Sequence, residues 1–173
     1  SWDSTWEPAH HWPIKARQVP GEREWEGLAL LSPHPIVDRA VLRLSRDLND
    51  PRDNFQRLVL GAQVRTPAGP FWLFNTHFPL SAQARDRVAI EARDFVRQIA
   101  GSLPFALTGD LNASPTEISI HELTAPGALT DAWATRHPGQ PGYTFPAWAP
   151  EKRIDHVLAP AAVEVVEIQV VGQ

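Results

Sequence analysis

The chain has 173 residues, of which 43% are hydrophobic and 21% are charged, and its formal net charge is −4 at pH 7. This size fits one domain that buries its own core, and the composition excludes a disordered chain. The absence of cysteine excludes disulfides, thiolate zinc sites and a cysteine nucleophile, and the acidic balance argues against a protein that grips nucleic acid mainly through its phosphates.

The first 25 residues are rich in tryptophan and proline and follow no clear period. We expect irregular structure there, with the aromatic rings packed on the core or forming a rim that faces a substrate. No apolar run reaches the roughly 20 residues that a membrane-spanning helix needs. Because the chain has no methionine, even at position 1, we expect it to be processed, trimmed or part of a longer protein.

The segments that follow are apolar or alternating, as strands are. In chain order the pattern predicts strands at residues 27–32, 36–44, 55–66 and 71–77, with a polar loop at 46–54 and a turn at 67–70. In the third strand Leu58, Leu60 and Ala62 share one face. The fourth is apolar on both faces, which indicates burial from two sides.

One long amphipathic helix comes next, because its apolar residues form a single stripe. These residues are Val88, Ala92, Phe95, Val96 and Ile99, and Gly101 is the expected cap. The pattern then predicts a strand at 103–108, a short helix beginning at the capping box 114–117, and late strands at 153–159 and 163–171. The mixture predicts an α/β layered domain, with packed sheets and outer helices, in a single unit over residues 1–173.

Three of these apolar strands end in a cluster of polar residues. The clusters are Asn75-Thr76-His77, Gly109-Asp110-Leu111-Asn112 and Arg153-Ile154-Asp155-His156. Strand ends are where α/β proteins usually build sites, and Asp, Asn and His suit a hard cation and a phosphate. Each cluster also has an ordinary alternative: a structural histidine, an aspartate that caps a turn, or an ion pair between Arg153 and Asp155.

In this order and with their flanks, the clusters resemble the endonuclease/exonuclease/phosphatase superfamily, which has a deoxyribonuclease-I-like fold. The matching segments are residues 26–32, 75–78, 109–112, 143–146 and 153–158. The resemblance implies a four-layer sandwich of two packed mixed β-sheets flanked by helices. It also implies hydrolysis of phosphodiesters or phosphomonoesters with Mg²⁺ or Mn²⁺.

The same resemblance implies roles for single residues. Asp110 resembles the carboxylate that orients or deprotonates the attacking water, and Asn112 the amide that holds the phosphate; these two are also the candidate metal contacts. His77 resembles the histidine that contacts the phosphate or protonates the leaving oxygen, and Glu26 its acidic partner. Asp155 resembles the carboxylate that orients the catalytic histidine near the end of the family's domain.

Two elements of the family are missing from the chain: an early glutamate that is the main metal ligand, and a terminal Ser-Asp-His. We therefore expect the domain to be incomplete at both termini and to bind the metal weakly. His156 is not expected to replace the missing histidine, because alternation along a strand turns it away from Asp155. Arg57, on the strand before His77, is a candidate phosphate ligand.

The sequence thus predicts a metal-dependent phosphodiesterase that works by in-line attack of an activated water on nucleic acid or on a lipid or small-molecule phosphate ester. A non-catalytic binding module with a degraded site is the alternative. A zinc hydrolase using His10, His11, His77 and Asp110 is disfavoured, because adjacent histidines are poorly spaced for one ion. We expect no obligate protein partner; a membrane surface as partner, and the compartment, are left open.

Overall fold

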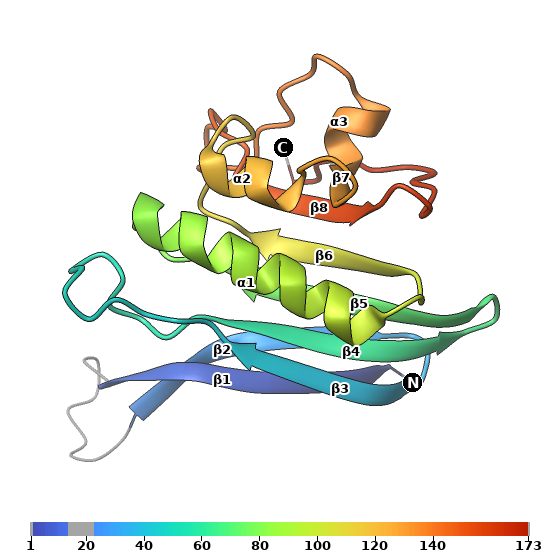
Figure 1. Ribbon diagram of the computed structural model, residues 1–173, viewed down its shortest axis with the longest axis horizontal. Coiled ribbons are helices and arrows are strands. Elements are labelled where there is room, and N and C mark those ends of the chain that lie inside the picture. Colours follow the sequence, from blue (N-terminus) through green and yellow to red (C-terminus); the bar gives the residue numbers. More distant parts are fainter. Residues whose placement is uncertain (1, 14–22, 173) are drawn as a thin grey trace.

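The computed structural model describes residues 2–13 and 23–172, and the side chains of residues 2–10 and 26–172. Two strands, β1 (Asp3–Pro13) and β2 (Arg23–Ser32), form a small antiparallel sheet. The larger sheet has the order β3-β4-β5-β6-β8-β7 (Figure 1). Its strands are β3 (Ile36–Arg43), β4 (Leu58–Thr66), β5 (Gly69–His77), β6 (Phe105–Asp110), β7 (Leu129–Asp131) and β8 (Asp155–Pro160).

Helix α1 (Ala82–Ala100) connects β5 to β6, which is why these two strands run parallel while the other neighbours in the sheet are antiparallel. Its predicted apolar stripe is confirmed, since Val88, Ala92 and Val96 are buried against the sheet. The Ser81 side chain accepts a hydrogen bond from the Ala84 amide at the start of the helix, and Gly101 ends it with a φ of 58°. A serine side chain therefore caps the start of α1, and a glycine ends it.

The larger sheet is covered on both faces. On one face α1 packs over Trp72, Phe74 and Leu107, which belong to the main core. On the other face the β1–β2 sheet packs through Leu30 against Leu58, Leu60 and Ala62. The predicted α/β arrangement of two packed sheets with outer helices is confirmed. Within the described residues the second sheet has two strands. Helix α2 (Ile118–Leu123) packs against α1, and helix α3 (Ala132–Arg136) packs against β8.

The prediction of irregular structure in the first 25 residues is wrong for residues 3–13, which form β1, and for residues 23–25, which begin β2. Strand pairing with β2 overrides the missing local period, and the pairing shifts by one residue between Pro8 and His10, at a β-bulge. Trp2 and Trp6 are 70% and 50% exposed, so they do not pack on the core. The predicted roles of Trp12 and Trp25 lie outside the described side chains.

Two later predictions are also corrected. The short helix begins at Ile118 rather than at the capping box: the Ser114 amide donates to the Glu117 carboxylate at 2.7 Å, but Glu117 is the residue that precedes the helix. Residues 163–171 form no strand, because their backbone pairs with neither edge strand of the larger sheet, β3 or β7. In the described part of the chain, none of the helices combines the length and the apolar character that crossing a bilayer requires.

Candidate active site

The register of the larger sheet brings three of the predicted site residues into one row. His77 is paired with Asp110 across the parallel strands β5 and β6, and Asp110 is paired with Asp155 across the antiparallel strands β6 and β8. Paired residues on adjacent strands point to the same face of a sheet. Residues far apart along the chain therefore meet where β5 and β6 end and β8 begins.

Gly109 allows β6 to approach β5 closely enough for this row to form. Its φ is 145°, and a Cβ at this position would lie 1.9 Å from the Thr76 carbonyl oxygen. Thr76 itself is buried, and its hydroxyl donates to the Leu58 carbonyl oxygen at 2.9 Å, which ties β5 to β4. The glycine before Asp110 is thus required by the backbone conformation and by the close approach of β5.

Asp110 is held on two sides. Its Oδ1 accepts a hydrogen bond from the Asn112 amide at 2.8 Å, and its Oδ2 lies 3.5 Å from Nε2 of His77. Asn112 has a φ of 49°, and its Nδ2 donates to the Phe78 carbonyl oxygen at 2.9 Å. Asp110 and His77 remain about one third exposed, at 32% and 33%. The pair is therefore fixed in orientation and still open to a ligand.

Glu26 and Arg57 approach the row from the other sheet and from the segment before β4. Oε1 of Glu26 lies 3.4 Å from Nη1 of Arg57, and its Oε2 lies 3.3 Å from Nε2 of His10. The resemblance led us to expect the Glu26 carboxylate beside His77; among the described side chains, the carboxylate within 4 Å of His77 is that of Asp110. Glu26, Arg57 and His77 line one small crevice together with apolar residues of β1, β2 and β4.

The charges of these residues act on one another. Burial lowers the pKa of His77, the Arg57 guanidinium lowers it further, and the carboxylates of Asp110, Glu26 and Asp155 oppose this shift. Burial also lowers the pKa of Arg57, against the charges of Glu26 and Asp110. Glu26, Arg57, His77, Asp110 and Asp155 therefore share one electrostatic environment, in which the neutral imidazole is the main form of His77 at pH 7.

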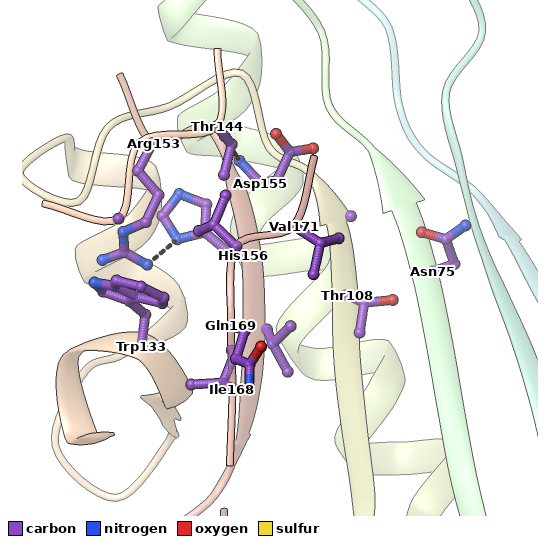
Figure 2. Close-up of a pocket in the computed structure, with 14 residues that line it drawn as sticks. Asn75, Thr108, Trp133, Thr144, Arg153, Asp155, His156, Ile168, Gln169 and Val171 are labelled. Atoms are coloured by element: carbon purple, nitrogen blue, oxygen red, sulfur yellow. Dashed lines mark hydrogen bonds between the residues drawn. The ribbon is translucent and has the colours of Figure 1, made fainter. Parts of the chain in front are cut away.

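Asp155 is exposed at the start of β8. Its backbone amide and that of Ile154 both lie 3.3 Å from Oγ1 of Thr144, to which they donate, so Thr144 fixes the backbone at this point (Figure 2). Arg153 pairs with Asp131 rather than with Asp155, so the ordinary alternative of an Arg153–Asp155 ion pair is wrong. His156 is buried on the opposite face, as strand alternation predicted.

Thr144 and His10 are site neighbours that the sequence reasoning did not single out as such. Thr144 lies within the 143–146 segment of the resemblance, and its hydroxyl contact with β8 could have been suspected there. His10 faces Glu26 across the β1–β2 pairing and stacks on Phe55 with ring centroids 4.9 Å apart. A strand prediction for residues 3–13 would have been needed to find it.

Asp110, Asn112 and Asp155 offer oxygen atoms of the kind that Mg²⁺ and Mn²⁺ prefer. Over residues 2–10 and 26–172, however, no three histidine, aspartate or glutamate side chains converge as an ion-binding group. One lone pair of Oδ1 of Asp110 is already used by the Asn112 amide. The described residues therefore do not fit a complete metal site, although they offer part of a ligand set.

The model of the endonuclease/exonuclease/phosphatase family matches residues 2–173. No curated protein sequence matches the chain. Among solved structures, the chain is similar to the human Nocturnin catalytic domain with bound sulfate, with a TM-score of 0.68 and 18% identity over 92% of this chain and 61% of that one.

A mannosyl-6-phosphatase from Bacteroides thetaiotaomicron is similar with a TM-score of 0.70 and 21% identity, over 93% of this chain and 63% of that chain. A truncated TDP2 from Caenorhabditis elegans is similar with a TM-score of 0.63 and 18% identity, over 92% of this chain and 61% of that chain. At these identities the likeness shows the fold alone. The chain spans about three fifths of the length of these structures.

Proposed function

The chain belongs to the endonuclease/exonuclease/phosphatase family, and from this we propose that it carries a major part of the active site of a metal-dependent phosphoesterase, specifically a phosphodiesterase. Members of this family are phosphoesterases and generally use a divalent metal ion. The observation that supports the proposal most directly is the row of His77, Asp110 and Asp155 across three adjacent strands, with Arg57 beside it.

Asp110 is the proposed group that orients or deprotonates the attacking water. The Asn112 amide occupies one lone pair of its Oδ1, and Oδ2 faces His77, so further acceptor positions remain for a water. Asn112 uses one of its two Nδ2 protons on the Phe78 carbonyl, so the other can donate to a phosphate oxygen. A carboxylate and an amide thus stand side by side, one suited to the nucleophile and one to the phosphate.

His77 and Arg57 are the proposed ligands of the phosphate. The guanidinium of Arg57 is buried and lines the same crevice as His77, and its Nε has no hydrogen-bond partner among the residues that the structure describes. His77 is mainly neutral before binding, but an anionic phosphate beside it would raise its pKa. Binding itself would therefore charge the ring and allow it to donate to the phosphate or to the leaving oxygen. Glu26 holds Arg57 in place.

Mg²⁺ or Mn²⁺ is the proposed cofactor, with Asp110 and Asn112 as the contacts that this chain would offer. When bound, the ion would polarise the phosphoryl oxygens and supply positive charge to the transition state. The described residues complete no ion-binding group, so this chain's contacts are one part of the coordination. The same incompleteness favours the second candidate, a binding module on this fold that holds a phosphate group without hydrolysing it.

Hydrolysis by the full-length protein tests the proposal. The substrates are bis(p-nitrophenyl) phosphate, plasmid DNA, RNA and, as a phosphomonoester, p-nitrophenyl phosphate, each with Mg²⁺, with Mn²⁺ and with a chelator. We expect metal-dependent cleavage of a diester, and Asp110→Asn should lower kcat by about 10²–10⁴-fold.

The matched control is Asp94→Asn, which makes the same chemical change on an exposed side chain of α1 and should leave kcat unchanged. Cleavage that survives Asp110→Asn would remove Asp110 from the mechanism. Binding of inorganic phosphate without cleavage of any substrate would support the binding module instead. A preference for the monoester would overturn the proposal of a phosphodiesterase but would leave the broader proposal of a phosphoesterase in place.

A further inference from the structure

Three ionisable side chains lie buried behind the candidate site and belong to neither its nucleophile nor its phosphate contacts. Asp131 ends β7, Arg153 precedes β8, and His156 is the second residue of β8. Their side chains are 10%, 6% and 0% exposed. Burying charged groups is costly unless they are paired, so this cluster needs an explanation.

The contacts within the cluster hold both ring nitrogens of its histidine. Nη1 of Arg153 donates to Oδ1 of Asp131 at 3.0 Å and forms an ion pair with its Oδ2 at 2.8 Å. The same nitrogen lies 3.3 Å from Nδ1 of His156 (Figure 2). Nδ1 of His156 also lies 3.6 Å from Oδ2 of Asp131, so this nitrogen faces the Arg153–Asp131 ion pair. Nε2 lies 2.9 Å from the Ala113 carbonyl oxygen, and because a carbonyl can only accept, Nε2 carries a proton and donates to it. His156 therefore bridges the Arg153–Asp131 pair and Ala113.

Ala113 is the residue after Asn112, so the bridge ends at the candidate phosphate contact. The segment 110–113 is held from the β5 side by the Asn112 side chain on the Phe78 carbonyl. From the β8 side it is held by two hydrogen bonds: Leu111 amide to Ile154 carbonyl at 2.8 Å, and His156 to Ala113. Asn112 has a φ of 49°, in the left-handed region, which asparagine adopts more readily than most other residues with a side chain.

His156 is also the neighbour of Asp155, and Figure 2 shows its ring turned toward Arg153 while the Asp155 carboxylate points away from both. Because these contacts hold the His156 ring in place, they also fix the face of the sheet on which Asp155 projects. The Asp131 end of the network is fixed in turn, because Oδ1 of Asp131 accepts from the Ala134 amide at the start of α3. One chain of contacts therefore runs from α3 through β8 to the loop that carries Asn112.

We propose that Asp131, Arg153 and His156 form a positioning network that sets the geometry of Asn112 and Asp155. A buried ion pair contributes little net stability compared with apolar residues of similar volume, so stability alone does not explain this cluster. Fixed geometry does, because polar contacts specify direction as well as proximity. The catalytic consequence of the network rests on the proposed function; the positioning itself does not.

Three substitutions of His156 separate positioning from packing. His156→Gln can place an amide nitrogen where Nε2 stands and keep the donation to Ala113. His156→Asn is shorter and can keep only the contact with Arg153. His156→Leu keeps volume and burial but neither polar contact. The first readout is hydrogen exchange of the Leu111 and Asn112 amides, with amides of α1 as internal reference; the second is kcat and KM of the full-length protein.

We expect His156→Gln to match the wild type in both readouts. In His156→Asn and His156→Leu the Leu111 and Asn112 amides should exchange at least about tenfold faster while the α1 amides are unchanged. Their kcat should fall by up to about 10²-fold with KM nearly constant, since misplacement of about 1 Å has effects of this size. A wild-type exchange pattern in His156→Leu would overturn the positioning role. Faster exchange in these variants, with no detectable hydrolysis by the wild type or any variant, would support the positioning role and overturn the proposed function.

Discussion

Gly109→Ala tests whether the close approach of β5 and β6 is what assembles the candidate site. The new Cβ would stand 1.9 Å from the Thr76 carbonyl oxygen, on a backbone with a φ of 145°. An ordinary carbon–oxygen contact is about 3.3 Å, so the strands would have to separate by roughly 1.4 Å at this point. Because His77 pairs with Asp110 one residue further on, the same separation would pull these two side chains apart.

The expected cost has two parts. A backbone angle that favours glycine costs an alanine about 1–3 kcal/mol. Each ladder hydrogen bond lost through the separation adds about 1 kcal/mol, and roughly two lie next to Gly109. We therefore expect the free energy of unfolding to fall by about 3–5 kcal/mol, and kcat of the folded fraction to fall by about 10²-fold through misplacement of Asp110.

Urea denaturation and steady-state kinetics measure the two effects. Gly69→Ala is the matched control, since Gly69 also has a positive φ, of 121°, but nothing lies within 4 Å of a Cβ there. It should show the backbone cost alone, about 1–3 kcal/mol, with unchanged kcat. If Gly109→Ala were no more destabilising than Gly69→Ala, the steric reasoning would be refuted. Full activity in Gly109→Ala would refute the link between strand approach and the site.

Three further outcomes are expected. Arg57→Gln should raise the pKa of His77, because the guanidinium lowers it; an NMR titration of the ring showing no rise would contradict the shared environment of these residues. Burial would raise the pKa of Asp131, but its contacts with His156, the Ala134 amide and Arg153 lower it to about 2. A lowered carboxylate pKa stabilises the fold above the unfolded value of about 3.9, so about 2 kcal/mol should be lost as the pH falls from about 4 to 2, and unfolding curves of Asp131→Asn should lack that loss. Inorganic phosphate should bind the full-length protein more tightly with Mg²⁺ or Mn²⁺ than with a chelator, and calorimetry showing equal affinities would argue against a shared site.

The sequence predicted elements whose signal is local. The strands near residues 36–44, 55–66 and 71–77 and helix α1 follow from alternation, apolar stripes and caps, and all are confirmed within a few residues. Strand β1 was not predicted, because its structure depends on pairing with β2 rather than on a period of its own. Residues 163–171 have the composition of a strand, but they pair with neither edge strand of the sheet, and composition alone does not reveal pairing.

The site residues can likewise be separated into those that the sequence predicted and those that only the fold reveals. Motif order singled out His77, Asp110, Asn112 and Asp155, and the sheet register brings the three charged or titratable ones into one row. Which carboxylate meets His77 depends on register across β5 and β6, and register cannot be read from a single sequence. The supporting contacts of Thr144 and His156 were out of reach for the same reason: each joins segments whose proximity only the fold decides.

The balance of charge in the candidate site bears on the divalent cation that we propose for it. Of the charges that act on His77, those of Asp110, Glu26 and Asp155 are negative, and that of Arg57 is positive. A phosphate ester would add negative charge to this set, so these residues together would attract it weakly. A divalent cation reverses that balance, because it is attracted by the carboxylates and attracts the phosphate in turn. The family generally uses a divalent metal ion, and the acidic row of this chain is what the proposed metal-dependent mechanism would require.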